Sequence, residues 1–497
     1  MNSEKSKYTK RGEKMLPENL QELIKQIIQR QSEAQTIEVK SAHQGCPKRL
    51  YDTLSSFSNQ DEGGILVFGL DETQNFAPVG VYDLQDLQKK VTEQCQQMEP
   101  VVRAVFTIAE MDGKQFLSAE IPGIDYSERP CFYKGAGKLK GSFIRTGDAD
   151  LPMTDYELYN YETFRKHIRN DERIVERASI DALDSDLLQR YVDQKKMDHP
   201  KFAQLPQEMI LSMLNIVQQG HPTIAALMNF GLYPQSFFPQ FAITAIAVMG
   251  NEIGDTDPSG ARFMDNERME GNLDAMLEGA ISFCRRNMKV HTVIDPLTGK
   301  RKDRMEYPIT AVREAILNAL IHRDYSHYTE GTPIQIDFFS NRLEIHSPGG
   351  LYGRMTVEDL GKVRLDLRNP TLAVMAEVMT QSENRYSGIP TMRKAMKEAN
   401  LPAPLFENRK GEFIVTFFNG QVPDEKIESI DSYPNWQMGL LQFCKEPRTK
   451  KEIADFLGMK TLYYVMSRYV KPLVKDGKLK VIAGEGGNQK GKKYYCP

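Results

Sequence analysis

A helix with a polar stripe constrains the fold of this chain more than any other segment does. Residues 313–325 read REAILNALIHRDY, and the spacing of the apolar residues predicts a helix from about Thr310 to His322. Glu314, Asn318 and His322 follow one another at intervals of four, so they share one face of that helix. A helix buried in a plain core would not carry three polar groups on one stripe. This face is therefore predicted to line a binding site.

The three polar side chains suit a nucleotide and its magnesium ion. The amide oxygen of Asn318 is a ligand that Mg²⁺ accepts while it bridges phosphates. A carboxylate such as Glu314 can orient a water molecule for attack on a phosphate, which makes it the candidate catalytic residue if ATP is hydrolysed. We therefore expect ATP and Mg²⁺ as cofactors, with Asn318 as the metal ligand and His322 as a further nucleotide contact.

Two glycine-containing loops follow the helix in the sequence. The loop His346–Gly350 comes after a predicted strand, where glycines let the backbone approach a base. The segment Tyr386–Pro390 opens a helix, with Pro390 suited to the first helical position and free amides suited to phosphate. The order of helix, hairpin, two loops and helix favours a nucleotide site. The further nucleotide contacts predicted from these loops are His346, Gly349, Gly350, Ser387, Gly388 and Ile389.

The stretch from about Tyr307 to Phe418 resembles the divergent GHKL-type ATPase domain of a RecG-related family of transcriptional regulators. The resemblance implies an α/β sandwich in which Glu314 polarises water and Asn318 binds Mg²⁺. Standard GHKL enzymes carry an adenine-binding Asp where this chain has Ser347-Pro348, and Tyr386 stands where a glycine is common. ATP binding is thus predicted, while hydrolysis stays open. The sequence has no GxxxxGK[ST] motif, so it does not predict a P-loop helicase motor.

The N-terminal region, residues 17–165, alternates short helical and strand-like patterns and predicts an α+β unit that ends in a loop at 148–152. Three of its segments, 33–40, 56–71 and 141–147, resemble the Schlafen/AlbA-like nucleic-acid-binding domain. The resemblance implies DNA, or RNA, as a partner. Candidate phosphate contacts are Lys40, Lys48, Arg49, Lys134, Lys138, Lys140 and Arg145.

Two interpretations of the acidic residues in this region remain open. In Schlafen-type nucleases three carboxylates hold a divalent metal that activates water, and Glu33, Glu38 and Asp71 match those positions by spacing and context. Alternatively, Glu38 pairs with Lys40 on a strand and Asp71 only turns the chain. We favour nucleic-acid binding without cleavage.

The C-terminal residues 435–497 have the layout of a winged helix. Thr449 is predicted to cap a helix from Lys450 to Leu457, and Lys460–Lys475 is the candidate recognition helix. The segment 445–497 carries 13 Lys and Arg against 5 Asp and Glu, although the whole chain has a net charge of -3. Local positive charge of this kind favours contact with phosphates, and a winged helix used for oligomerisation is the alternative. The candidate DNA contacts here are Lys460, Arg468, Lys490, Lys492 and Lys493.

A chain of 497 residues is too long for one hydrophobic core, so an α+β multidomain protein is expected. Its six cysteines show no CxxC pair, which favours reduced thiols over a zinc ribbon or a disulfide framework. The N-terminus has no apolar segment typical of a signal peptide, and no apolar stretch reaches the roughly 20 residues of a membrane span. The expected location is the cytoplasm, without membrane contact. The predicted parts are a flexible terminus (1–16), the Schlafen/AlbA-like domain (17–165), a mainly helical linking domain (166–300), the GHKL-like domain (301–420), a linker (421–434) and the winged helix (435–497).

Together these features predict an ATP-binding, DNA-binding transcriptional regulator in which nucleotide occupancy modulates nucleic-acid binding. One alternative is a metal-dependent nuclease gated by nucleotide. Another is a scaffold whose ATP site is vestigial. A homo-oligomer is expected by analogy with GHKL domains, which often dimerise.

Overall fold

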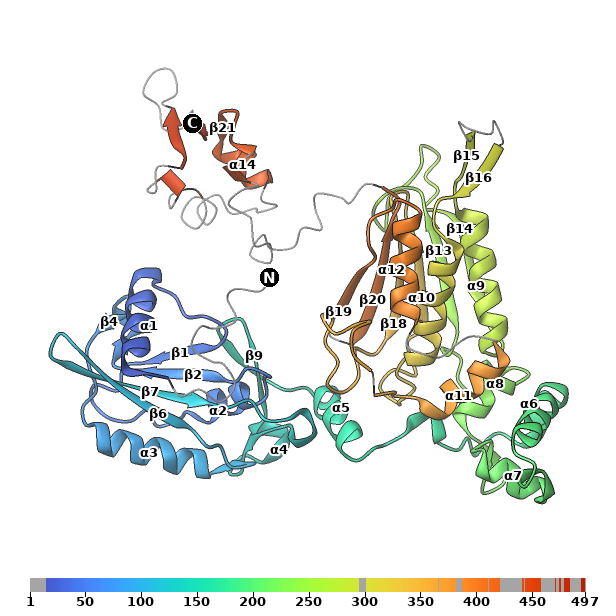
Figure 1. Ribbon diagram of the computed structural model, residues 1–497, viewed down its shortest axis with the longest axis horizontal. Helices are drawn as coiled ribbons and strands as arrows, with labels where there is room; N and C mark the ends of the chain where they lie inside the picture. The colour runs from blue at the N-terminus through green and yellow to red at the C-terminus, as the bar shows by residue number, and fades with distance from the viewer. Residues whose placement is uncertain are drawn as a thin grey trace. The chain divides into compact units, whose positions relative to one another are not determined.

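The computed structural model describes residues 15–294, 301–364, 366–380, 387–409, 411–420, 440–441, 443–456, 470, 473–474, 478–482 and 493–496. The chain divides into two compact units, one comprising Tyr8–Gly420 and the other containing Gln421–Pro497. Figure 1 labels many of the helices and strands of both units.

The N-terminal part of the larger unit is a four-stranded sheet with helices on both faces. Its strand order is β1-β2-β7-β6, with β1 and β2 parallel and the other pairs antiparallel. Alternate residues of β2 enter different cores: Ile65 and Val67 pack with α1, while Leu66 and Phe68 pack with α2 and α3. Figure 1 shows α1 and α3 on opposite sides of the sheet. The elements are α1 (Pro17–Arg30), β1 (Ile37–Lys40), α2 (Tyr51–Ser58), β2 (Gly64–Phe68), α3 (Leu84–Gln96), β6 (Val105–Met111) and β7 (Lys114–Ile121).

Short strands complete this domain, and one of them corrects the sequence prediction. Residues 148–152 were expected to form an exit loop, but β10 (Ala149–Pro152) pairs antiparallel with β9 (Phe143–Thr146). Gly147, with φ +64°, makes the tight turn between the two strands. The remaining short elements are β3 (Leu70–Asp71), β4 (Ala77–Pro78), β5 (Met98–Glu99), β8 (Phe132–Tyr133) and α4 (Gly137–Gly141).

A helical segment leads to the second large domain of this unit. α5 (Asp155–Arg165) begins at a capping box in which Thr154 and Glu157 satisfy each other's backbone N–H groups. All seven residues of α8 (Ile224–Phe230) are buried, and this helix packs against α11. The other elements are α6 (Ser185–Asp198), α7 (Gln207–Met213), β11 (Val217–Gln218) and β12 (His221–Pro222).

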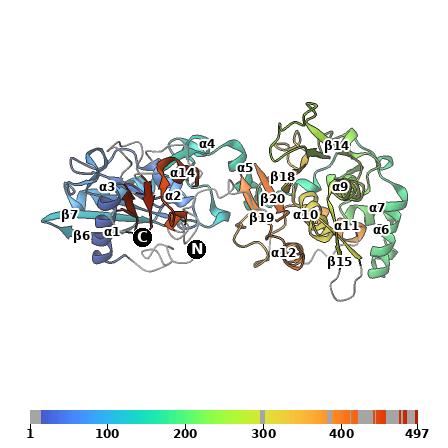
Figure 2. The same cartoon turned by 90° about the horizontal axis from the view of Figure 1, so that it is seen from above.

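The second large domain is an α/β sandwich built on a six-stranded sheet in the order β14-β13-β17-β18-β20-β19. β13 and β17 are parallel, and every other neighbouring pair is antiparallel. Figures 1 and 2 show α12, α10 and α9 side by side along one face. The strands are β13 (Ile243–Val248), β14 (Phe263–Met269), β17 (Ile334–Phe338), β18 (Arg342–Pro348), β19 (Leu405–Arg409) and β20 (Glu412–Phe418). The helices are α9 (Leu273–Asn287), α10 (Ile309–His322), α11 (Pro370–Met379) and α12 (Gly388–Glu398), and β15 (Val290–Ile294) pairs with β16 (Arg301–Met305) outside the sheet.

This sheet corrects the predicted boundary between residues 300 and 301. The buried strand expected at 241–249 is present as β13, but it pairs with β17 in the same sheet instead of belonging to a separate linking domain. β14 and α9 also lie before residue 301 and pack against the sandwich. The sequence placed the boundary too late because β13 pairs with a strand about 90 residues further along the chain.

In the smaller unit the described residues include a three-stranded antiparallel sheet, β21-β23-β22, and the helix α14. The predicted cap at Thr449 is confirmed, since the Glu452 N–H donates to Thr449 Oγ1 (3.3 Å) and the Thr449 N–H donates to Glu452 Oε2 (2.7 Å). Lys460, Arg468, Lys490 and Lys492 lie outside the described residues, and Lys493 is exposed. The elements are β21 (Arg448–Thr449), α14 (Lys450–Phe456), β22 (Lys480–Ile482) and β23 (Lys493–Tyr495). Among the residues described in either unit, no helix has the length and apolarity to cross a membrane.

Candidate functional site

The polar stripe of α10 opens into a pocket of about 410 Å³. Glu314, Asn318 and His322 all line it, as the helical spacing predicted. Eight apolar residues of α10 are buried, whereas these three side chains are only half-buried. The helix therefore turns its apolar surface to the core and its polar stripe to the pocket.

The two predicted loops supply other walls of the same pocket. The strands β18 and β20 provide its base through apolar side chains such as Ile345 and Val415. Tyr386 lies outside the described residues. The predicted loop residues that line the pocket are Gly349, Gly350, Ser387, Gly388 and Ile389.

Gly388 brings the start of α12 against the polar pair. A Cβ at this position would lie 2.9 Å from Asn318 Nδ2 and 3.0 Å from Glu314 Oε2, so only glycine leaves these two groups undisturbed. No side chain caps α12 at Ser387. Backbone amides in the first turn of a helix favour anions. This end of the pocket thus combines a carboxylate, an amide and a helix N-terminus.

Gly349 closes the other end of the pocket in a conformation that excludes side chains. Its φ is +93°, and a Cβ would lie 2.3 Å from Arg368 Nη1 and 2.6 Å from Asp324 Cβ. The Asp324 N–H donates to the carbonyl of Pro348 (2.8 Å), and the Gly349 N–H donates to the carbonyl of Gly411 (2.8 Å). The loop is therefore fastened to the end of α10 and to the turn before β20.

Burial shifts the protonation of the pocket's titratable groups. Desolvation raises the pKa of Glu314 from its usual value, and the neighbouring Arg313 opposes the shift. Desolvation, helped by the charge of Arg368, lowers the pKa of His322 to about 4. His322 is therefore neutral at pH 7 and has one ring nitrogen free to accept a hydrogen bond.

Arg368 is a pocket residue that the sequence reasoning missed. Its side chain is 4% exposed and lines the pocket, and its Nη2 donates to the carbonyl of Gly350 (3.0 Å). Nη1 has no hydrogen-bond partner among the residues that the structure describes. A buried guanidinium with unused donors is a ready contact for an anion or another acceptor. The signal in the sequence was an arginine just before the nearly all-apolar helix that begins at Pro370.

Its neighbour Asn369 fixes the arginine in place. Asn369 Nδ2 donates to the carbonyls of Ile321 and Arg323, both at 2.8 Å. These are free carbonyls at the C-terminal end of α10. The segment 368–370 therefore joins α11 to the end of the polar stripe.

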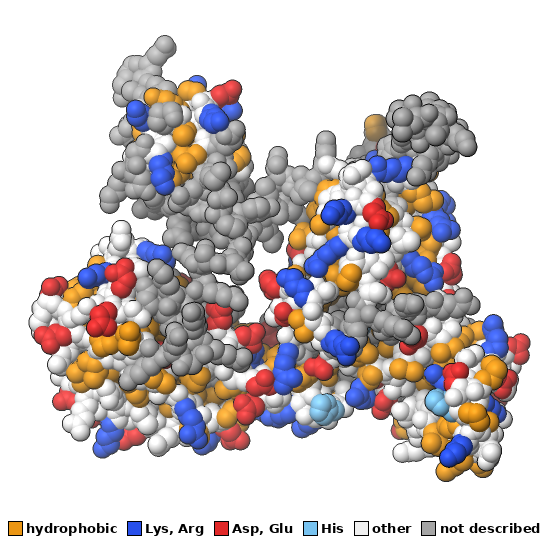
Figure 3. All heavy atoms as spheres, viewed as in Figure 1, with side chains coloured by type: hydrophobic (Ala, Val, Ile, Leu, Met, Phe, Trp, Pro, Cys, Tyr) orange, Lys and Arg blue, Asp and Glu red, His pale blue; other side chains and the backbone are white. Residues whose placement is uncertain are grey.

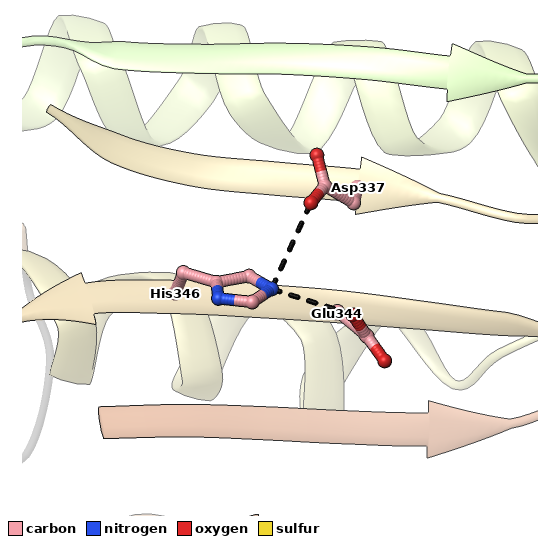
Figure 4. A group of neighbouring side chains, drawn as sticks. All are labelled: Asp337, Glu344 and His346. Atoms are coloured by element: carbon pink, nitrogen blue, oxygen red, sulfur yellow. Dashed lines mark hydrogen bonds and ion pairs between the residues drawn. The ribbon is translucent and has the colours of Figure 1, made fainter. Parts of the chain in front are cut away.

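His346 is the predicted nucleotide contact that the structure does not place in the pocket. Successive residues of a strand point to opposite faces of a sheet, so Ile345 and Ser347 face the pocket while His346 faces the other side. There it lies beside Asp337 and Glu344 (Figure 4). The prediction failed because it assigned the whole segment 346–350 to a loop, although β18 extends to Pro348.

In the N-terminal domain, buried Arg145 lies among three carboxylates. Its Nη2 lies 2.8 Å from Glu38 Oε2 and 3.7 Å from Glu33 Oε2, and its Nη1 lies 3.0 Å from Asp150 Oδ1. The residue is 5% exposed. The prediction that Arg145 contacts phosphate is therefore corrected, because its charge is used inside the domain.

The three carboxylates predicted for a nuclease are not gathered. Asp71 caps a short turn by accepting hydrogen bonds from the Thr73 N–H (3.0 Å) and Thr73 Oγ1 (2.7 Å). Among the described residues, one group of three His, Cys, Asp or Glu side chains has its ligand atoms within 4.8 Å of one another. This group is Asp337, Glu344 and His346. Burial, opposed by a backbone hydrogen bond and reinforced by the charge of Glu38, raises the pKa of Glu33 to about 7. Arg145 supplies the positive charge between Glu33 and Glu38 that a metal would otherwise supply.

The other predicted phosphate contacts of this domain divide into paired and exposed residues. Lys40 pairs with Glu38, and Lys138 with Glu162 (2.7 Å). Tyr51 stacks on Tyr133 with ring centroids 3.8 Å apart, which brings the start of α2 next to β8. Figure 3 shows basic and acidic side chains intermixed on the visible face of the larger unit. The exposed basic residues on either side of the stacked tyrosines in the sequence are Lys48, Arg49, Lys134 and Lys140, and Arg49 Nε also pairs with Asp52 Oδ2 (3.0 Å).

Comparison with known proteins identifies three segments of the chain. Residues 33–154 match the family described as "Schlafen, AlbA_2", and residues 331–417 match the family described as "Putative ATP-dependent DNA helicase recG C-terminal". Residues 162–244 match a domain of unknown function. Among curated proteins, none matches the chain.

Two solved structures are similar to the chain. One is a crystal structure of a Corynebacterium diphtheriae protein, 18% identical, covering 97% of each chain with a TM-score of 0.37. The other is the N-terminal domain of a RecG-related protein from Nitrosomonas europaea, 24% identical, covering 27% of this chain and 93% of that one with a TM-score of 0.23. The family matches establish that the chain carries a Schlafen/AlbA_2-type domain followed by a RecG-related, ATPase-type domain.

Proposed function

We propose that this chain is an ATP-binding regulator of transcription whose nucleotide site controls its affinity for DNA. One observation carries the proposal: a single pocket collects the polar stripe of α10, the glycine loop after β18 and the start of α12. A nucleoside triphosphate needs donors for its phosphates, an oxygen ligand for Mg²⁺ and room for a base. These three elements supply all of them.

The pocket has one polar end at Glu314 and another at His322, and these suit the phosphates and the base of a nucleotide. Glu314 and His322 are eight residues apart, which places them on the order of 12 Å apart along the helix. The phosphates would lie at the Glu314 end, where Asn318 holds Mg²⁺ and the N-terminus of α12 faces the negative charge. The base would lie at the His322 end.

Arg368 supports this orientation. The usual adenine-binding aspartate is absent, and Ser347 Oγ is engaged with the carbonyl of Ala319 (3.2 Å). The free Nη1 of Arg368 and the neutral ring of His322 offer a donor and a further ring nitrogen at the same end. Bound Mg²⁺–ATP would supply a triphosphate whose negative charge the ion neutralises. Glu314 would orient a water molecule toward that triphosphate.

Residues at the His322 end of the pocket also contact α5, the helix that follows the Schlafen/AlbA_2-type segment. Tyr156 Oη of α5 donates to Asp324 Oδ2 (2.9 Å), next to Gly349. A Cβ at Gly353 would lie 2.5 Å from Phe164 of the same helix. A nucleotide that moves the loop 349–355 therefore acts directly on α5.

An ion pair reinforces this contact between the two domains. Arg354 Nη2 lies 2.8 Å from Asp125 Oδ1, and the hydrogen bond from Arg354 holds the pKa of Asp125 well below its usual value. Coupling between a nucleotide and DNA requires that ATP bind two arrangements with different affinity. The contacts of α5 and Asp125 with the pocket loop are where such a difference would arise.

DNA is the proposed partner of both the N-terminal domain and the C-terminal segment. Lys48, Arg49, Lys134 and Lys140 would contact phosphates from the N-terminal domain, and the basic C-terminal segment would act as a winged helix. Nuclease activity is not proposed, because Arg145 pairs with Glu33 and Glu38 and these two carboxylates do not form, with Asp71, a group of ligand atoms within 4.8 Å of one another.

The test measures DNA affinity with and without ATP and Mg²⁺ for the wild type, Asn318→Ala and Tyr156→Phe. In the wild type we expect the nucleotide to change the dissociation constant for duplex DNA. Asn318→Ala should abolish both ATP binding and that change. Tyr156→Phe should keep ATP binding and lose the change, because it removes only the hydrogen bond to Asp324.

Tyr328→Phe is the matched control, because the Tyr328 ring packs against Tyr156 at the same contact and stays in place. It should behave as the wild type. A wild-type protein that binds ATP without any change in DNA affinity would refute the regulatory part of the proposal. A wild-type protein whose melting temperature ATP and Mg²⁺ do not raise would refute the nucleotide site itself.

A further inference from the structure

His346 belongs to a second polar cluster on the face of the sheet opposite the nucleotide pocket. Asp337 on β17 stands directly across from Glu344 on β18, and His346 is two residues further along β18 on the same face. Figure 4 shows the imidazole with Nε2 turned toward both carboxylates. Asp337 is 2% and Glu344 6% exposed, so the cluster is built into the sheet and not spread over the surface.

The distances from His346 Nε2 to the two carboxylates are longer than those of strong charged hydrogen bonds. His346 Nε2 lies 3.4 Å from Glu344 Oε2 and 3.7 Å from Asp337 Oδ2. A hydrogen bond between an imidazolium and a carboxylate spans about 2.7–2.9 Å. Two ligands on a tetrahedral ion with bonds of about 2.1 Å stand about 3.4 Å apart. Both distances from His346 Nε2 thus approach the spacing of two ligands on one ion, and all three ligand atoms lie within 4.8 Å of one another.

Groups around the cluster orient His346 and Glu344 and contact the carboxylate of Asp337. Glu412 Oε2 lies 3.1 Å from His346 Nδ1, so a proton on Nδ1 leaves the Nε2 lone pair toward the two carboxylates. Arg342 Nε donates to Glu344 Oε1 (2.7 Å), which leaves Oε2 toward His346. Gln335 Nε2 contacts both oxygens of Asp337, Oδ1 at 2.9 Å and Oδ2 at 3.1 Å. This is the arrangement of outer partners that metal-bound histidines and carboxylates have in proteins.

A separate observation is an unused polar atom beside the cluster. Thr416 on β20 stands directly across from Glu344 and is fully buried. Its Oγ1 has no hydrogen-bond partner among the described residues. A buried hydroxyl without a partner costs about 1–3 kcal/mol. A metal-bound water or the ion itself would satisfy it.

We infer that Asp337, Glu344 and His346 form a binding site for a divalent first-row transition ion of the Zn²⁺ class. Imidazole nitrogen together with two carboxylates favours Zn²⁺, Co²⁺ or Mn²⁺ over Mg²⁺, which prefers oxygen ligands alone. The site joins β17 to β18 and shares no side chain with the lining of the nucleotide pocket.

The experiment titrates Co²⁺ into the full-length chain after a chelator has removed bound metals, in the absence of nucleotide. We expect one equivalent of Co²⁺ to produce a visible absorption band that Zn²⁺ abolishes by competition. His346→Gln should weaken binding by at least about 100-fold, because it removes a direct ligand. Glu412→Gln should weaken it by about 10- to 100-fold, as loss of an outer partner does.

Two controls separate this site from other causes. His221→Gln changes a half-buried histidine whose Nδ1 lies 3.0 Å from the carbonyl oxygen of Ala178, and it should leave Co²⁺ binding unchanged. Asn318→Ala, which disables the proposed nucleotide site, should also leave it unchanged. The inference is overturned if Co²⁺ does not bind, or if it binds His346→Gln as tightly as His221→Gln. Equal melting temperatures of the chelator-treated variants show that lost binding does not reflect unfolding.

Discussion

Replacement of Gly388 by alanine tests the proposed phosphate end of the pocket most directly. The new Cβ would lie 2.9 Å from Asn318 Nδ2 and 3.0 Å from Glu314 Oε2, whereas ordinary contacts begin at 3.4 Å. The amide must therefore retreat by about 0.5 Å and the carboxylate by about 0.4 Å. Both atoms are ends of flexible side chains, so the retreat is structurally easy, but it moves the two groups that should hold Mg²⁺ and orient water.

The fold itself should tolerate this change. Gly388 lies in the first turn of α12 and does not have a positive φ, and alanine favours a helix by about 0.5–1 kcal/mol over glycine. Loss of one hydrogen bond or ligand to a charged group costs about 1.5–3 kcal/mol. We therefore expect the dissociation constant for ATP with Mg²⁺ to rise about 10- to 100-fold, with the melting temperature of the free protein unchanged or higher.

Isothermal titration calorimetry of ATP with Mg²⁺ measures the effect, and Gly331→Ala is the matched control. A Cβ at Gly331 meets no atom within 4 Å, so this variant should bind ATP as the wild type does. If folded Gly388→Ala binds ATP within about twofold of the wild type, then Glu314, Asn318 and the start of α12 do not hold the phosphates. The orientation proposed for the nucleotide would then be wrong.

Two further predictions concern buried charges. Burial raises the pKa of Asp171 to about 6, so its contribution to stability is fully present below about pH 4 and is lost as the pH rises to about 6. Asp171→Asn should therefore be more stable than the wild type at pH 7, by up to roughly 3 kcal/mol in the free energy of urea unfolding. This difference should vanish near pH 4. A difference that stays constant with pH would contradict the raised pKa of Asp171. Arg145→Met leaves Glu33, Glu38 and Asp150 without their partner and should cost roughly 3–5 kcal/mol of unfolding free energy, whereas exposed Lys140→Ala should change it by less than about 0.5 kcal/mol. Similar losses in the two variants would show that the Arg145 cluster adds no stability.

Local periodicity explains which parts of the nucleotide pocket could be predicted from the sequence. The stripe of Glu314, Asn318 and His322 needed only the helical repeat, and the structure places all three in one pocket. The side of the sheet on which His346 lies could be predicted only from the exact end of β18, because a shift of one residue moves a side chain to the other face. The place of Arg368 in the pocket depends on how α11 packs relative to α10, and no local sequence pattern predicts that packing.

Long-range pairing explains the other differences. Arginine is a common phosphate contact at protein surfaces, so the sequence alone favoured that role for Arg145. Only the fold brings Glu33, Glu38 and Asp150 around it. β13 has the pattern of a buried strand, but its partner β17 lies about 90 residues further along the chain. The sequence therefore predicts elements well where their own side chains decide the structure. It predicts boundaries and charge partners poorly, because these depend on contacts between distant segments.

β18 connects the two sites that the structure suggests. Its residues Ile345 and Ser347 face the nucleotide pocket, while Glu344 and His346 face the inferred metal site, and the strand runs directly into Gly349 and Gly350. An ion that holds β18 against β17 would therefore stiffen the strand that positions the glycine loop. Because coupling between two binding sites is reciprocal, any gain in ATP affinity caused by the metal must equal the gain in metal affinity caused by ATP. Measurement of both affinities in wild type and Glu412→Gln would show whether the opposite faces of this sheet act as one site or two.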